Sequence, residues 1–199
     1  MKMLANLLLV LCLIALLTAS PGGAHAQEND EGEDFDVDPV HSFVMFKVLH
    51  YNVGYVWGRF NEFEGEFHTA EFSPLLTATV QTGSIDTNHE QRDAHLRSAD
   101  FFDVENHPTM TFRSRTIDLE PDNSLEVVGD LTLLGETRPV TFTGALVGEG
   151  EDPNGQYRMG FEVSAVVNRT DFGMDFMVGP IGEEIEIILA VEGIRRENE

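Results

Sequence analysis

One charged segment, residues 85–103, departs from the pattern of the rest of the chain. It is rich in charged residues and histidine, and it ends in the adjacent aromatics Phe101 and Phe102. Residues 90–97 within it are predicted to form a short helix. The segments on either side are typical of β-strands. A charged, partly helical insertion in a β-protein is where a binding site or its rim is expected.

The rest of the chain, from Phe35 onward, reads as a succession of strands. A hairpin turn is expected at 135–137, a second turn at 153–155, and part of 169–176 is a further candidate helix. The sequence lacks an alternating strand–helix rhythm, so an antiparallel sandwich or barrel is expected. Long strands with bulky residues on one face favour a barrel of about eight strands, with an interior that is filled or holds one small ligand. The strands are predicted over 42–49, 55–68 (with bends or bulges at Gly58 and Gly65), 77–81, 109–117, 124–134, 138–147, 157–167 and 183–194.

The first 26 residues have the features of a secretory signal peptide. Lys2 supplies a positive charge, residues 4–17 form an apolar run, and residues 24–26 match an A-x-A cleavage site. We therefore predict cleavage after Ala26 and a periplasmic or secreted protein. An acidic disordered leader would follow over 27–34, and a single domain over 35–199. The one cysteine, Cys12, lies in the signal, so the exported domain would have no disulfide.

The charge balance narrows the classes of partner. The chain has 35 acidic and 12 basic residues, for a formal net charge of −23. Such a field repels phosphate backbones and anionic membrane surfaces, so nucleic-acid binding is not expected. After the signal, no segment is long and apolar enough to span a bilayer, so stable membrane insertion is not expected either. The acidity itself suggests high solubility or a saline habitat.

The common catalytic and metal-binding motifs are absent from the sequence. It contains no HExxH, no CxxC and no G-x-S-x-G. His89 and His95 lie six positions apart, which does not put two imidazoles on one helical face. With His107, they are the least unfavourable candidates for metal ligands. We predict no catalytic residues, no metal site and no cofactor.

A series of motifs, in order along the chain, resembles the YceI-like family. That family has a lipocalin-like barrel and binds polyisoprenoids or related amphiphiles. The match is strongest in the charged insertion and covers nearly all of the expected domain. The motifs lie at residues 37–42, 58–65, 85–87, 91–98, 101–103, 108–112, 129–132, 137–140 and 168–174.

The resemblance implies an elongated apolar pocket that holds a polyisoprenoid, prenyl quinone or fatty-acid derivative. Methionine and phenylalanine are abundant enough to form such an interior. The expected apolar lining is Phe43, Met45, Trp57, Met110, Phe112, Phe142, Phe161, Phe172, Met174 and Phe176. The expected polar mouth is His89, Arg92, Asp93, His95 and Arg97, with Arg59 and Arg169 as second-rank candidates.

Three alternatives remain open from the sequence. The chain could be a lipid hydrolase or isomerase, with His95 or His41 as base and Asp93 as its partner. It could instead be a stress-response or interaction protein with a fully packed barrel. Dimerisation through an exposed strand is left open as well.

Overall fold

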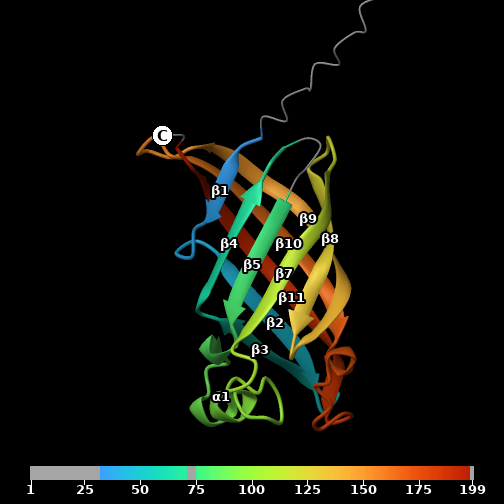
Figure 1. Cartoon of the computed structure of the whole chain (residues 1–199). Coiled ribbons are helices and arrows are strands. Elements are labelled where there is room, and N and C mark those ends of the chain that lie inside the picture. The colour runs from blue at the N-terminus through green and yellow to red at the C-terminus, as the bar shows by residue number, and fades with distance from the viewer. Residues whose placement is uncertain (1–31, 71–74, 198–199) are drawn as a thin grey trace, which may run out of the picture.

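The computed structural model describes residues 32–70 and 75–197, and its main feature is a closed antiparallel β-barrel. Eight strands form the ring, and the pairing of β1 with β11 closes it (Figure 1). The predicted fold class is therefore confirmed. In ring order the strands are β1 (Asp34–Val37), β4 (Phe63–His68), β5 (Leu75–Gln81), β7 (Thr109–Leu119), β8 (Ser124–Leu133), β9 (Glu136–Glu151), β10 (Tyr157–Asn168) and β11 (Ile181–Arg195).

Three further strands extend the wall toward one end of the barrel. β2 (Phe43–His50) pairs with the first part of β11, so β1 and β2 lie one after the other along that strand. β3 (Gly54–Phe60) pairs with β2, and the two-residue β6 (Ile85–Asp86) pairs with the end of β3. The helix α1 (Glu90–Leu96) and the 3-10 turns η1 (Thr82–Ser84) and η2 (Arg169–Phe172) complete the described elements. In Figure 1, α1 and the β2–β3 hairpin lie at the bottom of the barrel and β1 lies at the top.

Most predicted strands are present with small shifts at their ends, but the one predicted over 55–68 is divided. β3 ends at Phe60 and β4 begins at Phe63, whereas bends or bulges were predicted at Gly58 and Gly65. That prediction is wrong, because the strand pairing continues without a register shift through both glycines, which lie at points of close approach. A Cβ on Gly58 would lie 2.3 Å from Cζ of Phe46 on the paired strand. Glycine here makes room for a ring rather than for a turn.

The predicted boundary before the domain can be compared with the structure only in part. β1 begins at Asp34, so the last residue of the predicted leader belongs to the barrel. The side chain of Glu33 also pairs with Arg195, at 2.7 Å. The signal peptide and leader residues up to 31 lie outside the described residues. Within the described ranges, no helix has the length and apolar character that crossing a membrane requires.

Alternating side chains from the strands form the core. In β8, Leu125, Val127, Leu131 and Leu133 are buried together with Gly129, and the alternate residues are exposed or half-buried. Strand alternation of this kind places one set of side chains in the barrel and the other in solvent. The burial of that apolar set, at roughly 25 cal/mol per Å², is the main force that holds the ring closed.

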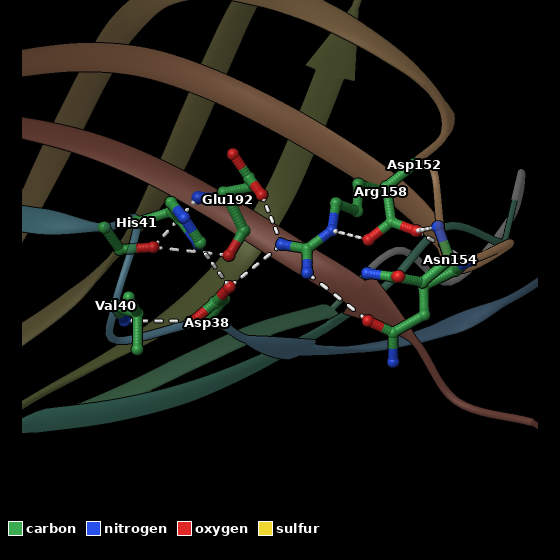
Figure 2. Close-up of polar contacts among 9 residues, drawn as sticks. Asp38, Val40, His41, Asp152, Asn154, Arg158 and Glu192 are labelled. Carbon is green, nitrogen blue, oxygen red and sulfur yellow. Dashed lines mark hydrogen bonds and ion pairs between the residues drawn. The ribbon is translucent and has the colours of Figure 1, made fainter.

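The loop between β1 and β2 is held by one arginine from a distant strand. Arg158 of β10 donates hydrogen bonds to Asp38 (2.9 Å), Glu192 (2.5 Å) and Asp152 (2.8 Å), as Figure 2 shows. His41 Nδ1 lies 2.7 Å from the same carboxylate of Asp38. Burial opposes ionisation of Asp38, but the hydrogen bonds from His41, Arg158 and the Val40 amide outweigh it and lower the pKa of Asp38 to about 2.

Candidate functional site

The barrel interior contains two adjoining apolar cavities. The larger has a volume of about 490 Å³ and the smaller, beside α1, about 300 Å³. Both volumes fall within or at the edge of the range of about 300–1,000 Å³ that is typical of small-molecule sites. Four residues border both cavities, so the two meet near the middle of the barrel. These shared residues are Val44, Met110, Leu131 and Ile187.

Aromatic rings lie against the wall of the larger cavity. Phe112 and Phe142 pack edge to face, with ring centroids 5.3 Å apart. Phe112 can lie against the wall because Gly129, two residues from its paired residue on β8, leaves room: a Cβ on Gly129 would lie 2.4 Å from the ring. The barrel is therefore hollow along part of its length, in contrast to the fully packed alternative.

The two ends of this interior carry different polar groups. At the α1 end, the smaller cavity is bordered by Arg92 and His95 from the insertion and by His50 from the β2–β3 hairpin. At the opposite end, the larger cavity is bordered by acidic residues, among them Asp118 and Glu120. An anionic head group is favoured electrostatically at the α1 end and disfavoured at the other.

Thr87 organises the start of the charged insertion. The buried carboxylate of Asp93 accepts hydrogen bonds from the Thr87 amide (2.9 Å) and hydroxyl (2.5 Å). Arg92 donates to the same hydroxyl through Nε (2.7 Å) and to the Thr87 carbonyl through Nη2 (2.6 Å). His89 caps α1 and accepts a hydrogen bond from the Arg92 amide at 3.3 Å. The side chains of Asp93 and His89 therefore form hydrogen bonds inside the insertion. The Arg92 side chain is held by Thr87 at the border of the smaller cavity.

The second half of the insertion is fixed by His95 and Arg97. Arg97 donates to the carbonyls of Gly83 (2.7 Å) and Ile85 (2.8 Å), which attaches α1 to the barrel. His95 Nε2 lies 2.8 Å from Asp100, and its ring packs edge-on against Phe101. The partner of His95 is thus Asp100, whereas Asp93 was proposed for the catalytic alternative. Of the five predicted mouth residues, Arg92 and His95 border a cavity, and His89, Asp93 and Arg97 do not.

The predicted apolar lining is distributed between cavity, core and outer surface. Three residues lie away from both cavities. Trp57 is 53 % exposed on the outer face of β3, with Lys47 Nζ 5.4 Å from its ring centre, because it alternates with the buried Phe60. Phe172 is buried in the core, and Phe176 packs against Phe101. The predicted residues that do border a cavity are Phe43, Met45, Met110, Phe112, Phe142, Phe161 and Met174.

Sequence reasoning missed several lining residues that the pattern could have indicated. Ile185, Ile187 and Leu189 of β11 alternate on one strand face and border the cavities. Met177 borders the smaller cavity, but it follows a short turn and no periodicity marks it. Their contact with a ligand, like that of the predicted residues, stays a prediction.

The second-rank arginines have other roles in the structure. Arg59 Nε lies 3.7 Å from Asp86 on the outer surface. Arg169 borders the smaller cavity, but its buried guanidinium is occupied by backbone carbonyls. It donates to the carbonyls of Gly182, Met174, Phe176 and Ile181.

One group of side chains has the composition of a metal site. Ligand atoms of Asp38, His41 and Glu192 lie within 4.8 Å of one another. Arg158 donates to both carboxylates of this group, so its guanidinium already supplies the compensating positive charge (Figure 2). The arrangement fits a structural ion-pair network.

The fold and cavities define a class of protein: a closed antiparallel barrel whose apolar interior opens beside a charged insertion. A family model for the YceI-like domain matches residues 35–193. A UPF0312 protein of Pseudomonas aeruginosa is 44 % identical over 164 residues, covering 81 % of this chain and 85 % of the relative. A UPF0312 protein of Pectobacterium atrosepticum is 39 % identical over 197 residues, covering 98 % and 100 %. The chain belongs to the YceI-like family.

Solved structures show the same fold at low sequence identity. BcnA of Burkholderia cenocepacia aligns with a TM-score of 0.70 at 20 % identity, over 78 % of this chain and 98 % of that one. A polyisoprenoid-binding domain from Saccharophagus degradans aligns with a TM-score of 0.63 at 12 % identity, over 81 % and 98 %. These likenesses support the barrel fold.

Proposed function

We propose that this protein binds one long-chain amphiphile in the barrel, with the apolar chain in the two cavities and the head group at the α1 end. The observation that carries the proposal is the pair of adjoining apolar cavities, of about 490 and 300 Å³. Candidate ligands are a polyisoprenoid, a prenyl quinone or a fatty-acid derivative. The description of the Saccharophagus degradans domain as polyisoprenoid-binding agrees with the first of these.

The energetics favour a long chain over a short one. Each buried methylene contributes roughly 0.8 kcal/mol, so eight contribute roughly 6 kcal/mol. Association costs about 4–15 kcal/mol in lost freedom of motion. A short acyl chain therefore binds weakly, and a chain that reaches through both cavities can bind at micromolar concentration or better.

The cellular role that we propose is transport or storage of such a lipid, or a part in a stress response, without covalent chemistry. The N-terminal signal features support an exported protein. A lipid of this kind is nearly insoluble in an aqueous compartment, where a soluble carrier would have a use.

Organic extraction of the protein purified from its own compartment, followed by mass spectrometry, tests the proposal directly. We expect one prenyl or acyl lipid at a near-stoichiometric level.

The matched variants Leu131→Trp and Val166→Trp add the same group inside and outside the barrel, since Leu131 borders both cavities and Val166 is exposed on β10. Leu131→Trp is expected to weaken binding of a fluorescent prenyl probe at least tenfold, and Val166→Trp to leave it unchanged. Equal probe affinity in both variants, or a native protein free of lipid that takes up no probe, would refute the proposal.

A further inference from the structure

An exposed apolar patch lies at the α1 end of the barrel. It consists of Tyr51, Val53, Tyr55 and Trp57 from the β2–β3 hairpin and Val178 from the segment before β11. Val53 is 85 % exposed, and the three aromatic residues are each more than half exposed. A hydrogen bond from the Tyr51 amide to the Pro180 carbonyl, at 2.8 Å, joins the two segments. Figure 1 shows the segment before β11 beside the β2–β3 end at the bottom of the molecule.

This patch lacks acidic residues although the chain as a whole is strongly acidic. The sequence has no Asp or Glu between residues 39 and 61 or between 176 and 182, against 35 in the whole chain. Lys47 Nζ lies 5.5 Å from the ring centre of Tyr55, and it pairs with the carboxylate of Glu186 at 2.7 Å. A patch of exposed Tyr and Trp, whose neighbouring lysine is already paired with a carboxylate, matches the chemistry of a membrane interface, where these amphipathic rings are enriched.

The backbone at the hairpin tip keeps a large side chain exposed. Tyr51 and Asn52 have φ angles of 48° and 55°, in the left-handed region that favours glycine. Tyr51 is 55 % exposed, with its ring edge-on to His50, and a left-handed backbone is unfavourable for a residue of this size. Such outliers gather at functional sites.

The patch is continuous with the mouth of the smaller cavity. His50, next to Tyr51, and Val56, between Tyr55 and Trp57, both border that cavity. Met177, next to Val178, does so too. A lipid bilayer that contacts the patch would therefore lie at the entrance through which an apolar chain reaches the interior.

We propose that this patch docks the barrel on a neutral lipid surface, from which the ligand enters through the α1 end. The inference rests on the proposed lipid binding and adds the partner surface and the direction of entry. A second copy of the chain is a weaker occupant, because a net charge of −23 opposes self-association and a dimer would cover the mouth. Docking here is peripheral, in the manner of proteins that lie on the interface without spanning the bilayer.

Flotation with vesicles of phosphatidylcholine and phosphatidylethanolamine tests the docking. For this test the protein is produced with its own predicted signal peptide. The intact mass of the purified protein then establishes where its N-terminus lies. The matched pair is Val53→Asp in the patch and Val147→Asp on β9, both at highly exposed valines. Val53→Asp is expected to lower vesicle binding at least tenfold and Val147→Asp to leave it unchanged. Tyr51→Gly, which relieves the left-handed backbone, is a second variant expected to bind vesicles less without loss of folding.

A second readout separates docking from lipid binding itself. Val53→Asp is expected to slow transfer of a prenyl probe from vesicles at least tenfold, and to leave the affinity for probe supplied without vesicles unchanged. Absence of vesicle binding by the unaltered protein would overturn the docking proposal, even if the probe binds. Equal losses in the two aspartate variants would also overturn it. So would sedimentation that shows a dimer dissociated by Val53→Asp without vesicle binding, since the patch would then join two copies.

Discussion

At the scale of single residues, Arg92 is the predicted mouth residue that best combines charge with position. It borders the smaller cavity, and two hydrogen bonds to Thr87 hold its guanidinium in place. Thr87 in turn donates to the buried Asp93, so the orientation of Arg92 depends on side chains that do not border the cavity. An arginine held in this way can pair with an anionic head group with little loss of side-chain entropy.

We expect Arg92→Gln to weaken binding of a prenyl phosphate by about three- to tenfold and to leave binding of the neutral prenyl alcohol unchanged. Lost charge pairing explains the first effect, and an intact apolar cavity explains the second. Competition with a fluorescent prenyl probe measures both affinities. Arg115→Gln is the control, because Arg115 pairs with Asp130 on the outer surface. Equal loss of affinity for the two ligands would place the head group elsewhere.

At the scale of secondary-structure elements, local pattern predicted most strands but not how they pair. Alternation marked β7 and β9, and an apolar set on one face marked β11. In β2 both alternating sets are apolar, so the sequence could not tell that Phe46 and Val48 point inward and that Phe43 is 42 % exposed. Burial on the inside and packing along the outside leave the same apolar signature.

Which strands pair over long distances could not be predicted from the sequence, for a different reason. The split of β1 from β2 depends on contacts between residues that are far apart in the chain. Ser42 Oγ donates to the Glu192 carbonyl at 3.2 Å, and the Glu192 amide donates back at 2.9 Å. The helix of the charged insertion was predicted over 90–97 and is found over Glu90–Leu96. Its internal partners, such as Asp93 with Thr87, follow from three-dimensional geometry that residue types alone do not specify.

The Arg158 network predicts a pH dependence of stability. Its carboxylate Asp38 has a pKa of about 2 in the folded protein, below the usual value of 3.8. Because the folded pKa is the lower one, Asp38 adds stability that is fully present above about pH 4 and is lost as the pH falls toward 2. The contribution is on the order of 1–2 kcal/mol. Urea unfolding at a series of pH values measures it.

Asp38→Asn should flatten this part of the pH profile and lower stability at neutral pH by roughly 1–3 kcal/mol, since Arg158 and His41 lose an ionised partner. Asp122→Asn is the comparison variant: hydrogen bonds from Ser124 in an exposed turn lower the pKa of Asp122 too, but the structure describes no arginine partner for it, so a smaller change of the acid slope is expected. An unchanged acid slope in Asp38→Asn would show that other carboxylates control the profile.

At the scale of the whole molecule, the sequence indicated a barrel of about eight strands but could not establish that it is hollow. The count of phenylalanine and methionine is the same for a filled and an empty interior. The difference lies in small steric choices, such as the glycine of β8 that lets Phe112 lie against the wall. Those choices leave apolar space at the centre, at some cost in the contacts that a filled core would make.

The charge of the whole molecule gives the last prediction. Basic residues number 12 against 35 acidic ones, so most carboxylates have no arginine or lysine to pair with, and repulsion dominates. Salt shortens the Debye length from about 10 Å at 0.1 M to about 3 Å at 1 M, which screens this repulsion. It also weakens surface ion pairs, but each of those is worth only about 0–1 kcal/mol.

We therefore expect molar sodium chloride to raise the thermal midpoint of unfolding by several degrees, measured by circular dichroism. Equal molar concentrations of uncharged glycerol in a parallel series separate screening from general solvent effects. A midpoint that is indifferent to salt would mean that the acidic surface is tolerated without cost, and that the charge reflects solubility and not adaptation to a saline medium.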